Sequence, residues 1–157
     1  MASGPSIVEQ VKKFQALQEE RVLTYKLFEE GFQAYLRGAP HYNFPIYRQL
    51  VHEITQTFKN ISSDVIDIIE SLKNQNKNII GTLMEQIQNE EQLKLELTAK
   101  LQFAEQNTVD HPHEELHKTE VTDLRQRIKS GIQQINEYLE ELKFECEDLY
   151  TENDCER

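Results

Sequence analysis

The sequence predicts an all-α protein: four long antiparallel helices in a coiled-coil-like, up-down-up-down bundle. Apolar residues recur at alternating three- and four-residue steps over most of the chain, which is the spacing of one helix face. The 157 residues include only 5 Gly and 4 Pro, with no proline between Pro45 and Pro112, so long helices are permitted. A chain of this length can bury roughly 70% of its unfolded surface, which is enough for one self-supporting core.

We expect a single helical domain over residues 1–157, with helices at about 6–37, 45–74, 78–106 and 113–150 and a frayed acidic tail at 151–157. The helices have similar lengths and short connections, which favour a closed antiparallel bundle. The alternative is an open pair of helical hairpins whose core is completed by a partner.

The first helix begins after Ser3 or Ser6, either of which can cap it, and ends where a Gly-Ala-Pro sequence follows. Gln18 and Arg21 interrupt its apolar stripe. Gly31 lies inside the helix and costs about 1 kcal/mol relative to alanine. Close approach of another helix would explain this glycine, and simple tolerance is the alternative.

The second helix begins near Pro45, with Asn43 or Phe44 as its cap, and keeps an unbroken apolar stripe to a turn rich in asparagine at 74–78. The third helix has the weakest stripe because Glu90 and Lys94 interrupt it. Three apolar residues lie off its line: Leu93, Leu95 and Phe103. A loop is expected at 107–113, and the fourth helix has the most regular stripe of the four.

The net charge of −11 is confined to one half of the chain. Residues 1–78 hold nine basic and nine acidic residues, whereas residues 79–157 hold eight basic and nineteen acidic ones. An acidic half repels a phosphate backbone, so direct, high-affinity nucleic-acid binding is disfavoured. No apolar run approaches the ~18 residues of a membrane span, and no signal segment is evident. We therefore expect an intracellular protein whose Cys146 and Cys155 are reduced and do not pair.

The residue types that support catalysis or metal binding are present but poorly arranged. Asp110 to Glu114, together with His117, resembles a metal cluster, and His113 and His117 would share a helix face. Acids at the start of a helix explain the same residues, so no metal is expected. Carboxylates that are adjacent in the sequence point in different directions on a helix, which indicates solvent-exposed faces and not a catalytic pair. The acidic residues beside Cys146 disfavour ionisation of its thiol. We expect a protein that is not an enzyme and has no cofactor.

One segment has the composition of a protein-binding surface. Residues 40–48 form a short loop dense in proline and aromatic residues that leads into the second helix. Exposed aromatic side chains together with arginine are typical of binding hot spots. The candidate partner-binding residues are Tyr42, Phe44, Pro45, Tyr47, Arg48, His52, Glu53 and Gln56. The alternative is that Tyr42 and Phe44 fold back and plug the end of the bundle.

The first two helices also carry a family resemblance. The matching segments are Leu17-Gln18-Glu19-Glu20-Arg21, Glu29-Glu30-Gly31, Tyr35-Leu36, Tyr42-x-Phe44-Pro45-x-Tyr47-Arg48 and Val51-His52-Glu53-x-Thr55-Gln56-x-Phe58. They resemble the required for excision 1-B domain family of eukaryotic DNA-repair proteins, over about residues 14–72. The resemblance implies a role in excision-type repair and a nuclear location, without excluding the cytoplasm. It implies no catalytic residue.

These observations lead to two hypotheses of different classes. The first is a non-enzymatic accessory protein in DNA repair, which binds repair or chromatin proteins; a basic partner such as a histone would suit the acidic half. The second is a structural coiled-coil subunit of a larger intracellular assembly. It would form a homo- or hetero-oligomer through the interrupted third helix.

Overall fold

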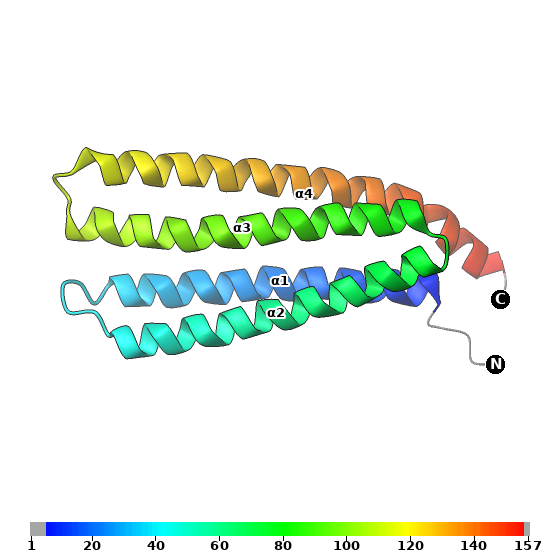
Figure 1. The fold of residues 1–157 in the computed structure, drawn as a ribbon, viewed down its shortest axis with the longest axis horizontal. Helices are drawn as coiled ribbons and strands as arrows, with labels where there is room; N and C mark the ends of the chain where they lie inside the picture. Colours follow the sequence, from blue (N-terminus) through cyan, green and yellow to red (C-terminus); the bar gives the residue numbers. More distant parts are fainter. Residues whose placement is uncertain (1–5, 156–157) are drawn as a thin grey trace.

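The chain forms four helices in the computed structural model, which describes residues 6–155, with side chains through Leu149. They are α1 (Ile7–Leu36), α2 (Phe44–Asn74), α3 (Asn78–Asp110) and α4 (Glu115–Cys155). Figure 1 shows two long hairpins, α1–α2 and α3–α4, lying side by side. The loops within the hairpins lie at one end, which we call the loop end, and the α2–α3 turn lies at the other. The predicted all-α bundle is confirmed.

Three helix boundaries differ from the prediction by two residues or more. α3 continues to Asp110, so the expected loop at 107–113 is reduced to His111–Glu114, and α4 starts at Glu115. Thr108 satisfies its hydroxyl within the helix by donating to the Ala104 carbonyl at 3.0 Å. The helix stops only where Pro112 disfavours helical geometry in the residue before it. Helix α4 also runs through most of the predicted tail, to Cys155, and residues 156–157 lie outside the described part.

Local side-chain bonds fix the other helix ends. The Ser6 hydroxyl accepts a hydrogen bond from the Glu9 backbone N–H at 3.0 Å, which identifies the cap of α1. The Asn43 side chain accepts one from the Ile46 N–H at 3.3 Å and caps α2. In the turn between α2 and α3, Asn76 adopts a φ of 64°, a left-handed conformation that asparagine tolerates better than most residues.

The hydrophobic core is continuous at the α2–α3 turn end and divided at the loop end. The largest cluster takes residues from all four helices, including Phe14, Val65, Ile87 and Cys146. At the loop end, α1 and α2 form a cluster around Phe28, Ile54 and Phe58, with Leu95 of α3 at its edge. Helices α3 and α4 form a separate one from Leu97, Ala104, Val121 and Leu124. The bundle is therefore closed at one end, and its hairpins diverge toward the other (Figure 1).

The polar break expected in the first helix meets polar residues of α3 in one buried layer. Of the residues expected to interrupt α3, Lys94 takes part and Glu90 does not; Gln88 and Glu91 are the buried ones. Arg21 is 2% exposed and donates to the side-chain oxygens of Gln18, at 2.6 Å, and Gln88. Its Nη1 lies 3.9 Å from Glu91 Oε2, and Lys94 Nζ lies 3.8 Å from Glu91 Oε1. Burial lowers the pKa of Arg21 and of Lys94, and Glu91 opposes both shifts. The interruption in α3 is thus matched by one in α1 within the bundle.

Helices α1 and α2 approach closely at Gly31. A Cβ atom at this position would lie 2.2 Å from Leu50 Cδ2. The Leu50 side chain of α2 thus fills the space beside Gly31, which favours close helix packing over simple tolerance.

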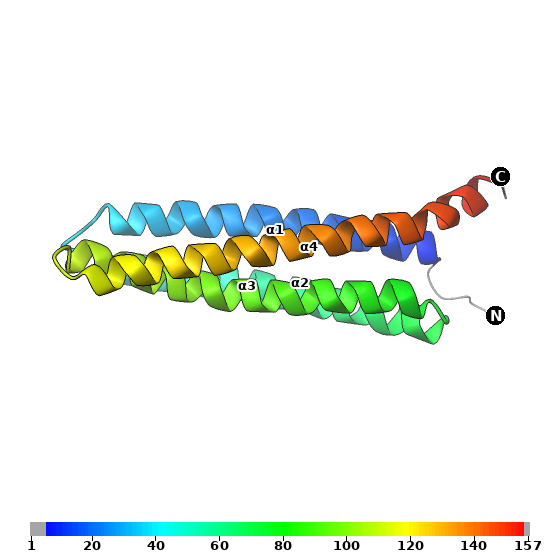
Figure 2. The ribbon, with the colours of Figure 1, turned by 90° about the horizontal axis from the view of Figure 1, so that it is seen from above.

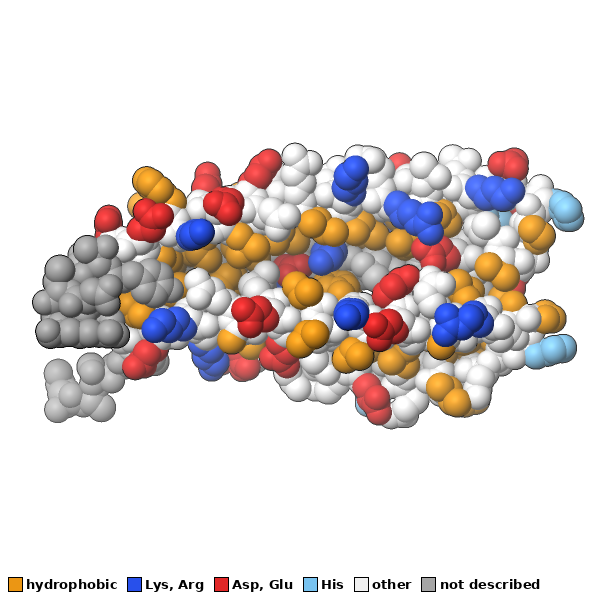
Figure 3. Space-filling model, turned by 180° about the vertical axis from the view of Figure 1, so that it is seen from behind, with side chains coloured by type: hydrophobic (Ala, Val, Ile, Leu, Met, Phe, Trp, Pro, Cys, Tyr) orange, Lys and Arg blue, Asp and Glu red, His pale blue; other side chains and the backbone are white. Residues whose placement is uncertain are grey.

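The contact between α1 and α4 is the sparse side of the bundle. Helix α3 packs mainly on α4 and α1 mainly on α2, whereas α1 and α4 touch little. Figure 2 shows these two helices lying next to each other along the molecule. On the corresponding face, Figure 3 shows a long hollow lined by hydrophobic side chains, with charged side chains of both signs along its edges. None of the helices described is long and apolar enough to cross a membrane.

Candidate functional site

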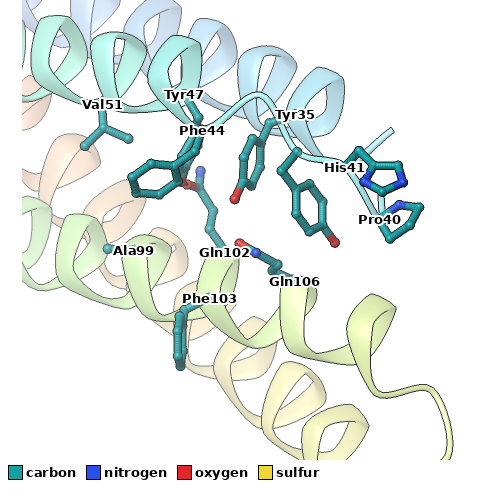
Figure 4. A pocket seen from close by; sticks show the side chains of 11 residues that line it. Tyr35, Pro40, His41, Phe44, Tyr47, Val51, Ala99, Gln102, Phe103 and Gln106 are labelled. Atoms are coloured by element: carbon teal, nitrogen blue, oxygen red, sulfur yellow. The ribbon is translucent and has the colours of Figure 1, made fainter. Parts of the chain in front are cut away.

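A groove at the loop end separates the tip of the α1–α2 hairpin from α3. Its volume is about 880 Å³, within the usual range for ligand pockets. Its lining residues are Tyr35, Pro40, His41, Tyr42, Phe44, Tyr47 and Val51 on one wall and Ala99, Gln102, Phe103 and Gln106 on the other (Figure 4). Among the described side chains, no Lys, Arg, Asp or Glu lines it. We call this feature the aromatic groove.

Three stacked tyrosines build the upper wall of the aromatic groove. The Tyr35 ring lies 4.2 Å from Tyr47 and 4.8 Å from Tyr42, centroid to centroid, with interplanar angles of 20° and 25°. The Tyr42 hydroxyl donates to Asp110 of α3, and burial followed by this hydrogen bond raises its pKa to about 12. Tyr42 therefore folds back and connects the two hairpins, as the plug interpretation expects.

Phe44 and Phe103 behave differently from the tyrosines. Phe44 begins α2 and is 52% exposed, and Phe103 projects from α3 with 69% exposure. The Arg48 guanidinium lies 5.4 Å from the Phe44 ring, a cation–π contact on the outside of the groove. Two phenylalanine rings thus remain exposed, Phe44 on one wall and Phe103 on the other, where the Phe103 ring points away from Phe44 (Figure 4). Exposed aromatic rings around a hollow are a feature of protein-binding sites.

Gln102 is the buried polar residue of the groove. It is 3% exposed, and its Oε1 accepts a hydrogen bond from the Tyr47 hydroxyl at 2.5 Å. Burial, and to a smaller extent Tyr35, raises the pKa of Tyr47 to about 12, so this hydroxyl stays protonated and able to donate near neutral pH. Within the described part of the chain, Gln102 Nε2 is buried and has no hydrogen-bond partner.

The structure divides the candidate residues between two surfaces. Tyr42, Phe44 and Tyr47 line the aromatic groove, whereas the other candidates do not. Those other residues are exposed on α2: Pro45, Arg48, His52, Glu53 and Gln56. The α3 wall was missed at the sequence level. Its only signal was Phe103, an aromatic residue off the apolar line of its helix.

The histidine-rich loop is arranged differently from the prediction. Since α4 begins at Glu115, His113 precedes the helix and does not share a face with His117; that prediction was wrong. His117 Nε2 instead lies 2.8 Å from Glu114 Oε2, and the His111 and His117 rings are 5.7 Å apart. Among the side chains described, those of residues 6–149, no group of three or more His, Cys, Asp or Glu residues is placed to hold a metal ion.

Cys146 lies in the core and is 1% exposed. Burial, followed by the charge of Glu145, raises the pKa of its thiol to about 11, which suppresses the reactive thiolate at neutral pH. The expected lack of pairing with Cys155 stays a prediction, because the Cys155 side chain lies outside the described part.

Fold and site together define a class: elongated four-helix-bundle proteins with a divided core and an uncharged aromatic groove at one end. Comparison with known proteins gives the family. The model of the DNA repair REX1-B family matches residues 9–105, and the chain belongs to this family. The matched region contains all but the first two residues of α1, the whole of α2, and both walls of the aromatic groove apart from Gln106. It extends well beyond the 14–72 segment on which the resemblance was based.

Three curated relatives cover most of the chain. It is 29% identical to the required for excision 1-B domain-containing proteins of Mus musculus and Bos taurus, over 87% and 90% of this chain and 79% and 77% of theirs. It is 28% identical to the heterochromatin silencing protein rss1 of Schizosaccharomyces pombe, over 87% of this chain and 98% of that protein. No solved structure matches significantly. The family and these names indicate a role related to DNA repair or chromatin.

Proposed function

We propose that this protein is a nuclear, non-enzymatic accessory factor in excision-type DNA repair, and that it acts by docking other proteins. The observation that carries the proposal is the aromatic groove, whose Phe44 and Phe103 rings are 52% and 69% exposed on opposite walls. Family membership supplies the link to repair. The uncharged lining and the raised pKa of Cys146 support binding over acid–base or thiol chemistry.

The charge distribution supports protein partners over DNA. Six acidic residues are exposed on the last turns of α4, with Lys143 as the only cation among them: Glu137, Glu140, Glu141, Glu145, Glu147 and Asp148. Such a surface repels phosphates and attracts basic protein segments. We assign it as a second contact surface, suited to a basic chromatin protein. If the protein nevertheless gripped DNA directly, micromolar protein would raise the anisotropy of a labelled, damaged duplex at low salt.

Affinity recovery from nuclear extract, before and after ultraviolet damage, tests the docking role. The test variant is Phe44→Ala with Phe103→Ala, and the matched control is Phe144→Ala, because Phe144 on α4 is 71% exposed and lies outside the groove. We expect wild type and control to recover the same repair or chromatin proteins and the double variant to lose them. Equal recovery by all three would refute docking at the groove.

A second double variant separates the two surfaces that carry the candidate residues. Arg48 and His52 lie on the exposed side of α2, away from the groove lining. If this side contributes to binding, Arg48→Ala with His52→Ala lowers partner recovery while helical content stays unchanged. Unchanged recovery at native stability would restrict the site to the groove.

The structural-subunit hypothesis retains one supporting observation. Val22, Leu23 and Leu27 of α1 are 67%, 61% and 57% exposed, and apolar side chains line the hollow in Figure 3. A second role as part of a helical assembly would cover such surface. Light scattering tests it: a dimer or larger species at micromolar concentration favours this hypothesis, and a stable monomer weakens it.

A further inference from the structure

The aromatic groove holds a hydrogen-bond donor in surplus. Gln102 Oε1 is occupied by the Tyr47 hydroxyl, and Nε2 has no partner in the described structure. Exchanging the amide O and N does not remove the surplus. Nε2 would then donate one hydrogen to the Tyr47 oxygen, while its second hydrogen and the tyrosine hydroxyl hydrogen would both remain free.

A donor that is buried without a partner destabilises the folded protein, because it has lost water and gained nothing. Gln102 is 3% exposed, so solvent does not compensate it. In Figure 4 its side chain extends from α3 across the groove toward the α2 wall. The position is suited to a ligand that brings an acceptor and no donor.

The rest of the groove restricts the ligand further. Tyr35 is enclosed between Tyr42 and Tyr47, so the accessible ring surface comes mainly from the two exposed phenylalanines. None of the groove's described lining residues is an acid, a lysine or an arginine. A charged ligand would find no Lys, Arg, Asp or Glu among these residues to pair with. Proline-rich segments meet these requirements: their rings pack on aromatic side chains, and their backbone presents carbonyl acceptors but no N–H donors at proline.

We propose that the aromatic groove binds an uncharged, proline-rich segment of a partner protein in the polyproline II conformation. Gln102 Nε2 donates to a carbonyl of this segment, and the segment's proline rings pack on the Phe44 ring and along the α3 wall at Phe103. The polyproline II conformation is already populated in the free segment, so little conformational entropy is lost on binding. The inference rests on the proposed docking function and names the chemistry of the docked segment.

Titration of the ¹⁵N-labelled full chain with acetyl-decaproline amide, followed by NMR, tests the proposal. We expect saturable shifts at the Gln102 side-chain amide and at the backbone of Ala99 and Phe103. A ten-residue Gly-Ser peptide should cause none. Gln102→Met keeps the side-chain length and removes the donor, and it should weaken binding about tenfold, the effect of one hydrogen bond. Phe103→Ala should also weaken it, and Phe144→Ala should not.

Two outcomes would overturn the inference: no saturable shift at millimolar decaproline, or equal affinity of wild type and Gln102→Met. Phe103→Ala serves as a second variant in case Gln102→Met misfolds. The Phe103 side chain is exposed, so its removal should leave the fold intact. If decaproline fails while partner recovery from extract still depends on Phe44 and Phe103, the docking function stands and the segment has another chemistry. If decaproline binds but the groove variants recover every partner, the docking function fails instead.

Discussion

Replacement of Gly31 by alanine tests the close packing of α1 on α2, which supports one wall of the aromatic groove. The new Cβ would lie 2.2 Å from Leu50 Cδ2 and 3.1 Å from Leu50 Cδ1, whereas ordinary contact begins at 3.4 Å. The three atoms nearest to this Cβ all belong to the Leu50 side chain. The clash can therefore be removed by a second substitution, Leu50→Ala.

The two contributions to stability have opposite signs. Alanine in a helix interior stabilises by about 1 kcal/mol relative to glycine. Overpacking costs about 1–3 kcal/mol. Gly31→Ala alone should thus lower the free energy of unfolding by up to about 2 kcal/mol. In the Leu50→Ala background it should raise that energy by about 1 kcal/mol, because only the helix propensity remains. The coupling between the two sites is then about 1–3 kcal/mol.

Urea unfolding followed by circular dichroism measures all four proteins of this cycle. Gly131→Ala in α4 is the control: its Cβ would meet only Glu90 Oε2, at 3.9 Å, so this variant should be about 1 kcal/mol more stable than wild type. If Gly31→Ala stabilises equally in both backgrounds, Leu50 moves aside freely. The account of Gly31 as a packing requirement would then be wrong.

Three further predictions concern the polar layer, the groove and the turn. Arg21→Met should lower the free energy of unfolding by about 3 kcal/mol in urea, because it leaves the buried Glu91 with Lys94 as its one cation and removes the donor to Gln18 and Gln88; adding Glu91→Leu should recover part of the loss. Tyr47 has its pKa raised to about 12, so its contribution to stability is full below pH 10 and is lost between pH 10 and 12; Tyr47→Phe should reduce this alkaline loss in pH-dependent unfolding. Asn76, at φ 64°, should accept glycine without loss of melting temperature, whereas Asn76→Val should destabilise by about 1–2 kcal/mol.

The helices were predictable because their signals are local. Ser6 and Asn43 each cap a helix that begins beside them, and the apolar stripes need only regular spacing. The end of α3 was less predictable, because the polar Asn107 and Thr108 resemble loop residues until the hydrogen bond from Thr108 to Ala104 is seen. Local composition underestimates the length of a helix when its polar side chains hydrogen-bond to backbone carbonyls of the preceding turn.

The groove was only half predictable, because its second wall is remote in sequence. Residues Tyr42, Phe44 and Tyr47 lie in one aromatic segment, which composition alone singles out. Gln102 and Phe103 join them through the packing of the two hairpins, which depends on where the core divides. The spacing of apolar residues along one helix does not specify how far two hairpins diverge.

The most direct test of the central claim is an excision assay in nuclear extract depleted of this protein. Three purified proteins are added back separately: wild type, the control Phe144→Ala, and the double variant Phe44→Ala with Phe103→Ala. Their free energies of unfolding are first shown to be equal, and removal of ultraviolet lesions from a plasmid is then measured. The account predicts that wild type and Phe144→Ala restore excision and that the groove variant does not. Full restoration by the groove variant would contradict the claim that the protein supports repair by docking a partner at this site.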